Sequence, residues 1–591
     1  ANTIGRSYAT RFSQLPQIGR FMEPSDRPLT DSPAGFVPPH PGSKQMPRWD
    51  GGELPTAPIF TGRNLAMMLG PGLVLGASAI GGGEWLTGPL VTARFGGSLL
   101  WLCTLSILGQ VIYNIEISRY ALYSGEPIFT GKFRTFPGPM VWVFVYLLLD
   151  LGSVLPYLAS NAAVPAAAML LKRIPDPSST AETWNLLGTG LTDRGLLKVL
   201  SCAIFASVFI PLSVGGKVYN SMKVVMTFKL ITVMGFLAFL AIFFSSWETW
   251  TEIFSGFIKF GNVPVIPPEA GGKAIDNVFL AAREGRINSL FFGTGPGVFD
   301  LCVVGILASM AAISGNGGLT NTPISNYTRD QGWGMGRHVG AIPSIVGGHA
   351  IKLSHVGMVF PVNAESLHRW KGWMKHVARE QWYLWMPACF LGIALPSMLS
   401  VQFLPRGTIL TNNWLAAGMT ADGVSEAVGG RLGSSFGDTF WYLTLFCGLL
   451  VLGTSMASTA DGVLRRWVDV FWTAVPWLRK WDTRHIGRLY FGVLCIYLVF
   501  GFVMLTVVPG DRLLVIGTGI LYNYALGFSC FHVVVINSIL LPKELRPGWG
   551  RRICLVLAGV FFSTIAVIST TQQVPDLIKE FQALQQAEVA K

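Results

Sequence analysis

The chain has 591 residues, of which 51% are hydrophobic and 13% are charged, and its formal net charge at pH 7 is +12. Too little charged surface is present to solvate a soluble protein of this length, so we expect the chain to lie in a lipid bilayer. The Lys and Arg residues fall mainly in loops between apolar segments, where they fix orientation in the membrane. We therefore expect no nucleic-acid partner.

Residues 1–62 are rich in Pro, Ser, Gly and Arg and contain no apolar stretch typical of a signal peptide. They are predicted to form a polar cytoplasmic tail. The composition then becomes apolar, and we predict one transporter domain over residues 63–575. Residues 576–591 are predicted to be a short C-terminal tail.

Apolar windows of roughly 20 residues, long enough to cross the hydrocarbon core, predict about eleven membrane spans. They cover residues 65–94, 98–123, 140–169, 196–214, 224–244, 298–325, 383–403, 440–463, 489–508, 513–541 and 553–570. Lys and Arg are concentrated before span one and after each even-numbered span up to span ten, which is typical of cytoplasmic loops. The pattern predicts a cytoplasmic N-terminus and an outer C-terminus, in a membrane that we expect to be the bacterial inner membrane.

Spans one and six each contain a run of glycines. Gly81, Gly82 and Gly83 lie in the middle of span one, and the segment GNGG begins at Gly315 in span six. Each glycine disfavours a helix by about 1 kcal/mol relative to alanine, so both spans are predicted to unwind. The alternative is that these glycines only allow close helix packing.

Each break lies in the first span of a set of five, spans one to five and spans six to ten. Because each set has an odd number of spans, the two sets start on opposite sides of the membrane. The predicted fold is therefore an all-α integral membrane protein with a five-plus-five inverted repeat, broken helices one and six, and an eleventh helix. Interrupted helices at matching positions point to a substrate or ion site near the middle of the bilayer.

Glu84 and Asp150 are acidic residues inside predicted spans that stand out as candidate functional residues. Glu84 follows the first break, and a carboxylate at this depth costs about 2.5–3.5 kcal/mol, which favours a functional role. Asp150 lies in span three, within VYLLLDLGSVL. It is a candidate coupling charge, or else one half of a buried salt bridge with an Arg at a helix end.

Polar side chains also occur in spans eight and ten. Ser455 and Ser458 belong to LGTSMASTADG in span eight and are candidates for coordinating a coupling ion, although small residues also serve as helix contacts in membranes. Thr518 and Asn523 near the start of span ten are candidate substrate ligands, with helix packing as the alternative.

No arrangement of nucleophile, base and orienting group typical of an enzyme is found, nor a phosphate-binding glycine loop followed by Lys and Ser or Thr. The eight cysteines have no spacing that suits zinc or disulfides. We expect neither an enzyme nor a permanently bound cofactor.

At these residues the chain resembles the Nramp family of proton-coupled divalent-metal transporters. The segment GPGLVLGASAIGGGEWLT lines up with the family's span-one pattern, so that Gly81, Gly82, Gly83 and Glu84 stand at its Asp-Pro-Gly-Asn motif. LLLDLGSVL is similar to the family's Asp-Leu-Ala-Glu stretch and places Asp150 at the matching acid. The resemblance implies a LeuT-like fold of ten helices in an inverted repeat, followed by an eleventh helix.

The sequence departs from the family at its metal ligands. Gly81 replaces the metal-binding Asp of span one, and GNGGLTNTP replaces the Met-Pro-His motif of span six. No soft sulfur ligand is evident. A hard cation such as Mg²⁺ would suit Glu84, Asn316 and backbone carbonyl oxygens better than a soft transition metal.

The leading functional hypothesis is an Nramp-like secondary transporter that moves a divalent cation, Mg²⁺ or Mn²⁺, by alternating access. Its predicted metal ligands are Glu84 and Asn316, its further substrate or ion ligands are Gly81, Gly82, Gly315, Thr518 and Asn523, and its coupling residues are Asp150, Ser455 and Ser458. One alternative is a Na⁺- or H⁺-coupled transporter of a small organic solute. Another is a transport-inactive membrane subunit or sensor, which would have a partner subunit in the membrane.

Overall fold

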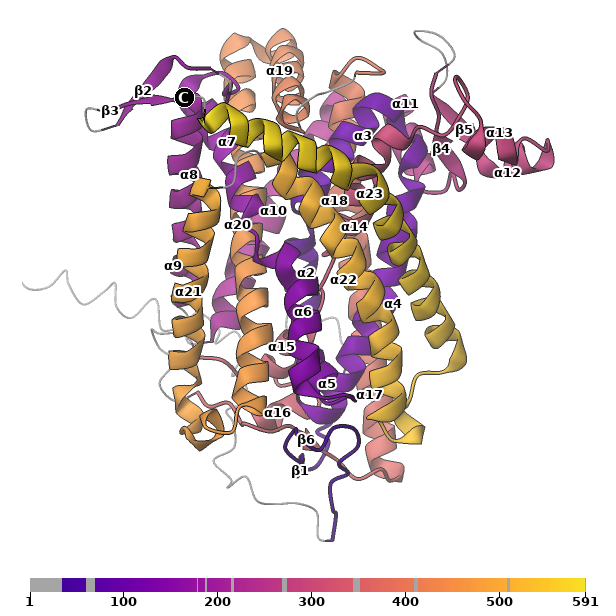
Figure 1. The fold of residues 1–591 in the computed structure, drawn as a ribbon, viewed down its shortest axis with the longest axis vertical. Coiled ribbons are helices and arrows are strands. Elements are labelled where there is room, and N and C mark those ends of the chain that lie inside the picture. Colours follow the sequence, from indigo (N-terminus) through magenta and orange to yellow (C-terminus); the bar gives the residue numbers. More distant parts are fainter. Residues whose placement is uncertain are drawn as a thin grey trace, which may run out of the picture.

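The computed structural model describes residues 35–59, 70–177, 179–186, 189–213, 217–267, 274–343, 351–408, 413–507 and 511–589. In these residues 8 helices are long and apolar enough to cross a membrane, or up to 9 if a bent pair is one span. Figure 1 shows them as a bundle along the long axis. A helical integral membrane protein is thus confirmed, and the eleven spans and inverted repeat stay predictions.

In chain order the helices are α2 (Pro71–Ala79), α3 (Gly88–Phe95), α4 (Trp101–Ser124), α5 (Ile128–Phe133), α6 (Pro139–Val154), α7 (Tyr157–Leu171), α8 (Asp193–Ser207), α9 (Phe209–Ser213), α10 (Val218–Phe244), α11 (Trp247–Gly256), α12 (Val278–Arg283), α13 (Ile287–Phe292), α14 (Val304–Ile313), α15 (Pro323–Asp330), α16 (Gly336–Val339), α17 (Ala364–Glu380), α18 (Met386–Phe403), α19 (Asn413–Leu432), α20 (Ser434–Ala474), α21 (Ile486–Val507), α22 (Asp511–Ile539) and α23 (Trp549–Val589). The short strands are β1 (Asp50–Gly51), β2 (Glu182–Leu186), β3 (Thr189–Thr192), β4 (Asn262–Pro264), β5 (Ile275–Asn277) and β6 (Met358–Val359). They form three two-stranded pairs, β1–β6, β2–β3 and β4–β5.

The first predicted break is confirmed. Helix α2 ends at Ala79, and Ile80 turns the backbone out of the helix with ψ 90°. The chain becomes helical again in a π-helical turn over Gly83–Thr87, which leads into α3. Span one is therefore two short helices joined by a few unwound residues.

The second predicted break is confirmed as well. Helix α14 ends at Ile313 and α15 begins at Pro323. Between them Gly315, Gly317 and Gly318 have φ values of +97°, +66° and +54°. Residues with a Cβ rarely adopt this left-handed region, so the glycines are what allows the chain to turn here.

Span three has an interruption that the sequence analysis did not predict. Helix α6 ends at Val154, and α7 begins at Tyr157. Pro156 lies between them, and a proline disfavours helical geometry in the preceding residue. The interruption places Tyr157 at the start of a new helix.

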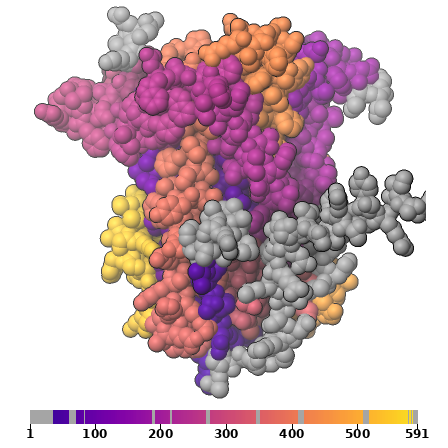
Figure 2. Space-filling view, turned by 180° about the vertical axis from the view of Figure 1, so that it is seen from behind, coloured from indigo at the N-terminus to yellow at the C-terminus, as the bar shows by residue number. Residues whose placement is uncertain are grey.

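Long helices extend beyond the predicted spans at both ends of the bundle. Helix α17 continues through a π-helical turn (Gln381–Trp385) into α18. Helix α23 runs on to Val589, so much of the predicted C-terminal tail is helical. Figure 2 shows α19 (orange) and the region from α11 to α13 (magenta) forming a broad cap at the end opposite to β1.

Part of the predicted polar tail packs against the bundle. Met46, Trp49 and Leu54 are buried, and β1 pairs in parallel with β6. The Trp49 indole donates a hydrogen bond to Glu126 Oε2 at 3.0 Å, and Arg134 Nε donates to the same oxygen at 2.7 Å. These contacts hold the N-terminal segment, which we define as residues 43–57, against the loop between α4 and α5.

Glu126 should stay ionised over most of the pH range. Burial raises the pKa of its carboxyl, but the charge of Arg134 and the hydrogen bonds from Arg134 and Trp49 outweigh burial and hold the pKa below its usual value. A lowered pKa means that the contribution to stability is present above the ordinary carboxyl pKa and is lost as the pH falls through the folded value.

We therefore predict that Glu126→Gln releases the N-terminal segment, because it leaves a buried arginine without its partner at a cost of roughly 3–5 kcal/mol. Hydrogen–deuterium exchange of residues 43–57 should become at least about tenfold faster. The wild type should lose protection only below about pH 4. The control is Glu284→Gln in an exposed pair with Arg286, and equal exchange in both variants would contradict this account.

A second prediction concerns the break of span six. A Cβ on Gly317 would lie 2.1 Å from the carbonyl oxygen of Ala312, whereas a Cβ on Gly332, which also has positive φ, would meet nothing closer than 3.8 Å. Gly317→Ala should therefore lower the melting temperature by several degrees more than Gly332→Ala, since both carry the backbone strain of roughly 1–2 kcal/mol and only the former adds a clash. Equal shifts in thermal unfolding would show that the break is not tightly packed.

Candidate functional site

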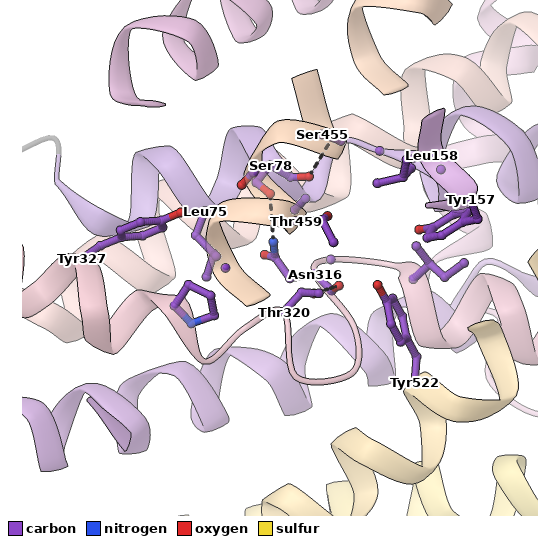
Figure 3. Close-up of a pocket in the computed structure, with 18 residues that line it drawn as sticks. Leu75, Ser78, Tyr157, Leu158, Asn316, Thr320, Tyr327, Ser455, Thr459 and Tyr522 are labelled. Atoms are coloured by element: carbon purple, nitrogen blue, oxygen red, sulfur yellow. Dashed lines mark hydrogen bonds between the residues drawn. The ribbon is translucent and has the colours of Figure 1, made fainter. Parts of the chain in front are cut away.

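A cavity of about 460 Å³, part of it open to solvent, lies where the two broken spans meet. Figure 3 shows side chains from both breaks and from neighbouring helices converging on it. Its polar or aromatic side chains are Ser78, Tyr157, Asn316, Thr320, Tyr327, Ser455, Ser458, Thr459 and Tyr522. The part of its wall that the structure describes carries no charged side chain.

Asn316, a predicted ligand, lies in this cavity and is held from two sides. The Trp385 indole donates a hydrogen bond to Asn316 Oδ1 at 3.1 Å, and Asn316 Nδ2 makes a long contact of 3.5 Å to Ser78 Oγ. The side chain therefore connects the second break with the helix that precedes the first one. It presents an amide to the cavity without adding charge.

Other predicted ligands also reach the cavity. Gly81, Gly82 and Gly315 form part of its wall, as do the predicted coupling residues Ser455 and Ser458 of α20. The structure thus brings residues of the two breaks and of span eight together, while their roles in binding and coupling stay predictions.

Glu84 joins the two breaks instead of lining the cavity. Its Oε2 accepts a hydrogen bond from the Gly81 amide at 2.9 Å, and its Oε1 accepts one from the Gly315 amide at 3.1 Å. The side chain is fully buried. Each oxygen keeps a further lone pair, but the carboxylate does not line the cavity, and its role as a metal ligand stays a prediction.

Lys229 is a site residue that the sequence analysis missed. It lies in α10 with 0% exposure and donates a hydrogen bond from Nζ to Ser455 Oγ at 2.6 Å. A lone lysine within the apolar window 224–244 is as costly to bury in the membrane as the carboxylate of Glu84. Lys229 could therefore have been identified from the sequence by the same argument.

Gln110 of α4 is a second missed residue. Its Oε1 accepts hydrogen bonds from the amides of Asn316 at 3.1 Å and Gly317 at 3.3 Å, and its Nε2 donates to the Ser314 carbonyl at 2.7 Å. One amide side chain thereby replaces several of the backbone hydrogen bonds that unwinding removes. It fixes the shape of the second break.

Asp150 forms a buried salt bridge, as its alternative interpretation expected, but its partner Arg466 lies within α20 and not at a helix end. Its carboxylate pairs with Arg466 at 2.6 Å and accepts a hydrogen bond from the Trp467 indole at 2.9 Å. Arg466 also donates to the carbonyl of Leu319 at 3.0 Å, within the second break. Asp150 is not part of the cavity wall, and its coupling role stays a prediction.

Thr518 and Asn523 lie on α22, away from the cavity wall. Thr518 is buried. Asn523 Nδ2 donates hydrogen bonds to the carbonyls of Ala308 and Gly519, both at 3.0 Å, and so joins α22 to α14. These contacts support the packing alternative for Asn523.

A buried charge network borders the cavity on the side of the N-terminal segment. Tyr327, which lines the cavity, donates a hydrogen bond to Asp461 at 3.1 Å, and Arg465 pairs with both Asp461 and Asp330. Arg329 pairs with Asp469 at 2.6 Å. The network fastens α15 to α20 beside the cavity.

No protein-family model matches the sequence, and no curated protein matches it. Among solved structures, the manganese transporter of Eremococcus coleocola in complex with an aromatic bis-isothiourea substituted compound is similar, with a TM-score of 0.55 and 12% identity over 90% of this chain and 93% of that chain. A mutant of that transporter gives a TM-score of 0.57 and 11% identity over 91% of this chain and 94% of that chain. At such low identity the likeness shows the fold alone, and that fold is one used by a membrane transporter.

Proposed function

We propose that the chain is a secondary transporter that binds a small, uncharged polar organic solute between its two broken helices and moves it by alternating access. The observation that carries this proposal is the cavity, whose wall is supplied by both breaks and by hydroxyl, amide and tyrosine side chains. We also propose that the chain lies in a bacterial inner membrane with a cytoplasmic N-terminus and an outer C-terminus. The basis for this orientation is the distribution of Lys and Arg in the loops.

Transport is supported by the way in which the four half-helices meet. Helices α2 and α14 end at the cavity, and helical structure resumes on its far side at Gly83 and at Pro323. Unwound segments at such a place offer backbone groups to a cargo and can move when the halves rearrange. The likeness to a transporter fold agrees with this reading.

An uncharged cargo is supported by the balance of charge. Glu84 does not line the cavity, and each of its oxygens accepts a backbone amide. A divalent cation would therefore meet no carboxylate on the described part of the wall, and an unpaired charge at this depth is costly. Hydroxyls and tyrosine rings suit a neutral polar molecule.

A divalent cation, Mg²⁺ or Mn²⁺, is the second candidate. It is favoured by the fold, which is shared with a manganese transporter, and by the oxygen atoms of Ser78 and Asn316 at the cavity. Glu84 does not line the cavity, so the carboxylate or the backbone beside it would have to move for Glu84 to bind the cation. A transport-inactive subunit or sensor is a third possibility, and uptake measurements separate it from both transporters.

The first test is ligand-induced stabilisation of the purified protein. In thermal unfolding with a panel of small amides, nucleobases and polyols, we expect at least one solute to raise the melting temperature, because saturation at about 100 times Kd contributes about 2.7 kcal/mol. Asn316→Ala should abolish the shift, and Asn185→Ala in β2 should retain it. The proposal fails if no solute in the panel stabilises the protein and Mn²⁺ or Mg²⁺ does.

The second test addresses the metal directly. Proteoliposomes with the wild-type chain should accumulate Mn²⁺ and Mg²⁺ no faster than protein-free vesicles, since the site offers a dication no net negative charge. Accumulation above that background, removed by Glu84→Gln and retained in Glu284→Gln, would establish the second candidate instead.

A further inference from the structure

A side arm projects from the bundle between α11 and α14. It contains β4, β5, α12 and α13, and we define it as residues 258–267 and 274–299. Figure 1 shows α12 and α13 extending sideways beyond the helices of the bundle, at the end opposite to β1. Figure 2 shows the same projection (magenta) from behind. The side arm therefore lies beside the bundle and not over its centre.

The base of the side arm is fixed at the level where a membrane span begins. Trp101 Nε1 donates a hydrogen bond to the carbonyl of Asn262 at 2.9 Å, and Asn262 Nδ2 donates to the carbonyl of Ser98 at 3.3 Å. Ser98 and Trp101 lie at the start of the predicted second span, residues 98–123. Tryptophans are enriched where a chain passes from the hydrocarbon to the headgroups. The side arm is thus level with the headgroup region.

The side arm has a small hydrophobic core of its own. Val265, Ala281 and Leu290 are buried together in this core. The strands β4 and β5 pair in antiparallel orientation, and the amide of Phe299 donates a hydrogen bond to the carbonyl of Leu290 at 2.8 Å. The side arm therefore folds without burying its other apolar side chains.

Large apolar side chains remain outside this core. Phe292 at the end of α13 is 83% exposed, and Phe279 of α12 is 67% exposed. Leu280 and Phe291 are exposed as well. Arg283 adds an exposed positive charge at the end of α12. Exposed aromatic side chains accompanied by a basic residue are typical of segments that lie in a membrane interface.

Exposed apolar side chains also lead along the chain from span five to the side arm. Ile242 and Phe243 are exposed near the end of α10, which is long and apolar enough to cross a membrane, so these side chains face lipid. Trp247 at the start of α11 and Ile258 at the start of the side arm are exposed too. This continuity with the lipid-facing surface favours lipid over a protein partner at the side arm.

We propose that the side arm lies in the headgroup region of the surrounding bilayer, with Phe279 and Phe292 in contact with lipid. The inference goes beyond the proposed transport function and requires no cargo. It bears on the broken spans, because the side arm leads directly to Asp300. The Asp300 carboxylate pairs with Arg94 of α3 at 3.0 Å and accepts a hydrogen bond from the amide of Cys302, just before α14. A side arm held by lipid is thus connected to one half of each broken span.

The experiment measures the surroundings of a nitroxide spin label on the side arm of the full chain. Phe292→Cys is labelled in a chain in which serine replaces the cysteines that are not buried, and the protein is placed in nanodiscs of phosphatidylethanolamine and phosphatidylglycerol. Those cysteines are Cys202, Cys302, Cys495 and Cys554. Power saturation in electron paramagnetic resonance compares collisions of the label with O₂, which concentrates in lipid, and with a nickel chelate, which stays in water.

Two further labelled positions provide the references. Phe243→Cys lies on the exposed surface of span five and reports lipid, and Ser435→Cys lies at the exposed start of α20 and reports water. The ratio of O₂ to nickel collisions at Phe292→Cys should be several-fold higher than at Ser435→Cys and should approach that at Phe243→Cys. Phe279→Cys should give the same result, and it decides the matter if Phe292→Cys does not fold.

A ratio no higher than that at Ser435→Cys would overturn the inference, because the side arm would then lie in water. Low collision rates with both reagents would overturn it as well, since they would show that protein, such as a second copy of the chain, covers the surface. Neither result depends on solute binding at Asn316, so failure of this inference is distinct from failure of the proposed function.

Discussion

The carboxylate of Glu84 is the interaction on which the site depends. An unwound helix in a membrane leaves backbone amides without partners, and each one costs several kcal/mol in a medium without water. Glu84 accepts the amide of Gly81 in the first break and that of Gly315 in the second. One side chain thus satisfies both breaks and fixes their separation.

Other side chains also supply hydrogen-bond partners to the unwound backbone. Gln110 supplies acceptors for the second break, and Arg466 binds its Leu319 carbonyl while paired with Asp150. Lys229 of α10 donates a hydrogen bond to Ser455 of α20, beside the first break. The described wall of the cavity therefore carries polar but no charged side chains. This is the reason for proposing a neutral solute in preference to a dication.

The local features of this site could be predicted from the sequence, because they depend on residue type alone. Glycine runs predict unwinding, and the positive φ values of Gly315 and Gly317 show why glycine is needed there. Glu84 and Asn316 could also be identified from residue type and position, because one is a carboxylate beside the first break and the other is an amide within the second. The interruption before Tyr157 was missed, although Pro156 signalled it.

Partnerships between distant residues could not be predicted in this way. Asp150 and Arg466 are 316 positions apart, and Lys229 and Ser455 are 226 positions apart. Only the packing of the spans decides whether a buried charge meets an opposite charge, an amide or a ligand. The sequence led to Glu84 as a candidate metal ligand, and the structure adds that its carboxylate links the two breaks.

The most direct test of the central claim is a density map of the purified protein with bound solute, at a resolution that shows side chains. The account predicts solute density between Asn316 and Tyr157, with the Glu84 carboxylate still on the amides of Gly81 and Gly315. A single compact density with oxygen atoms of Glu84 and Asn316 at about 2.1 Å, the distance typical of Mg²⁺, would contradict it.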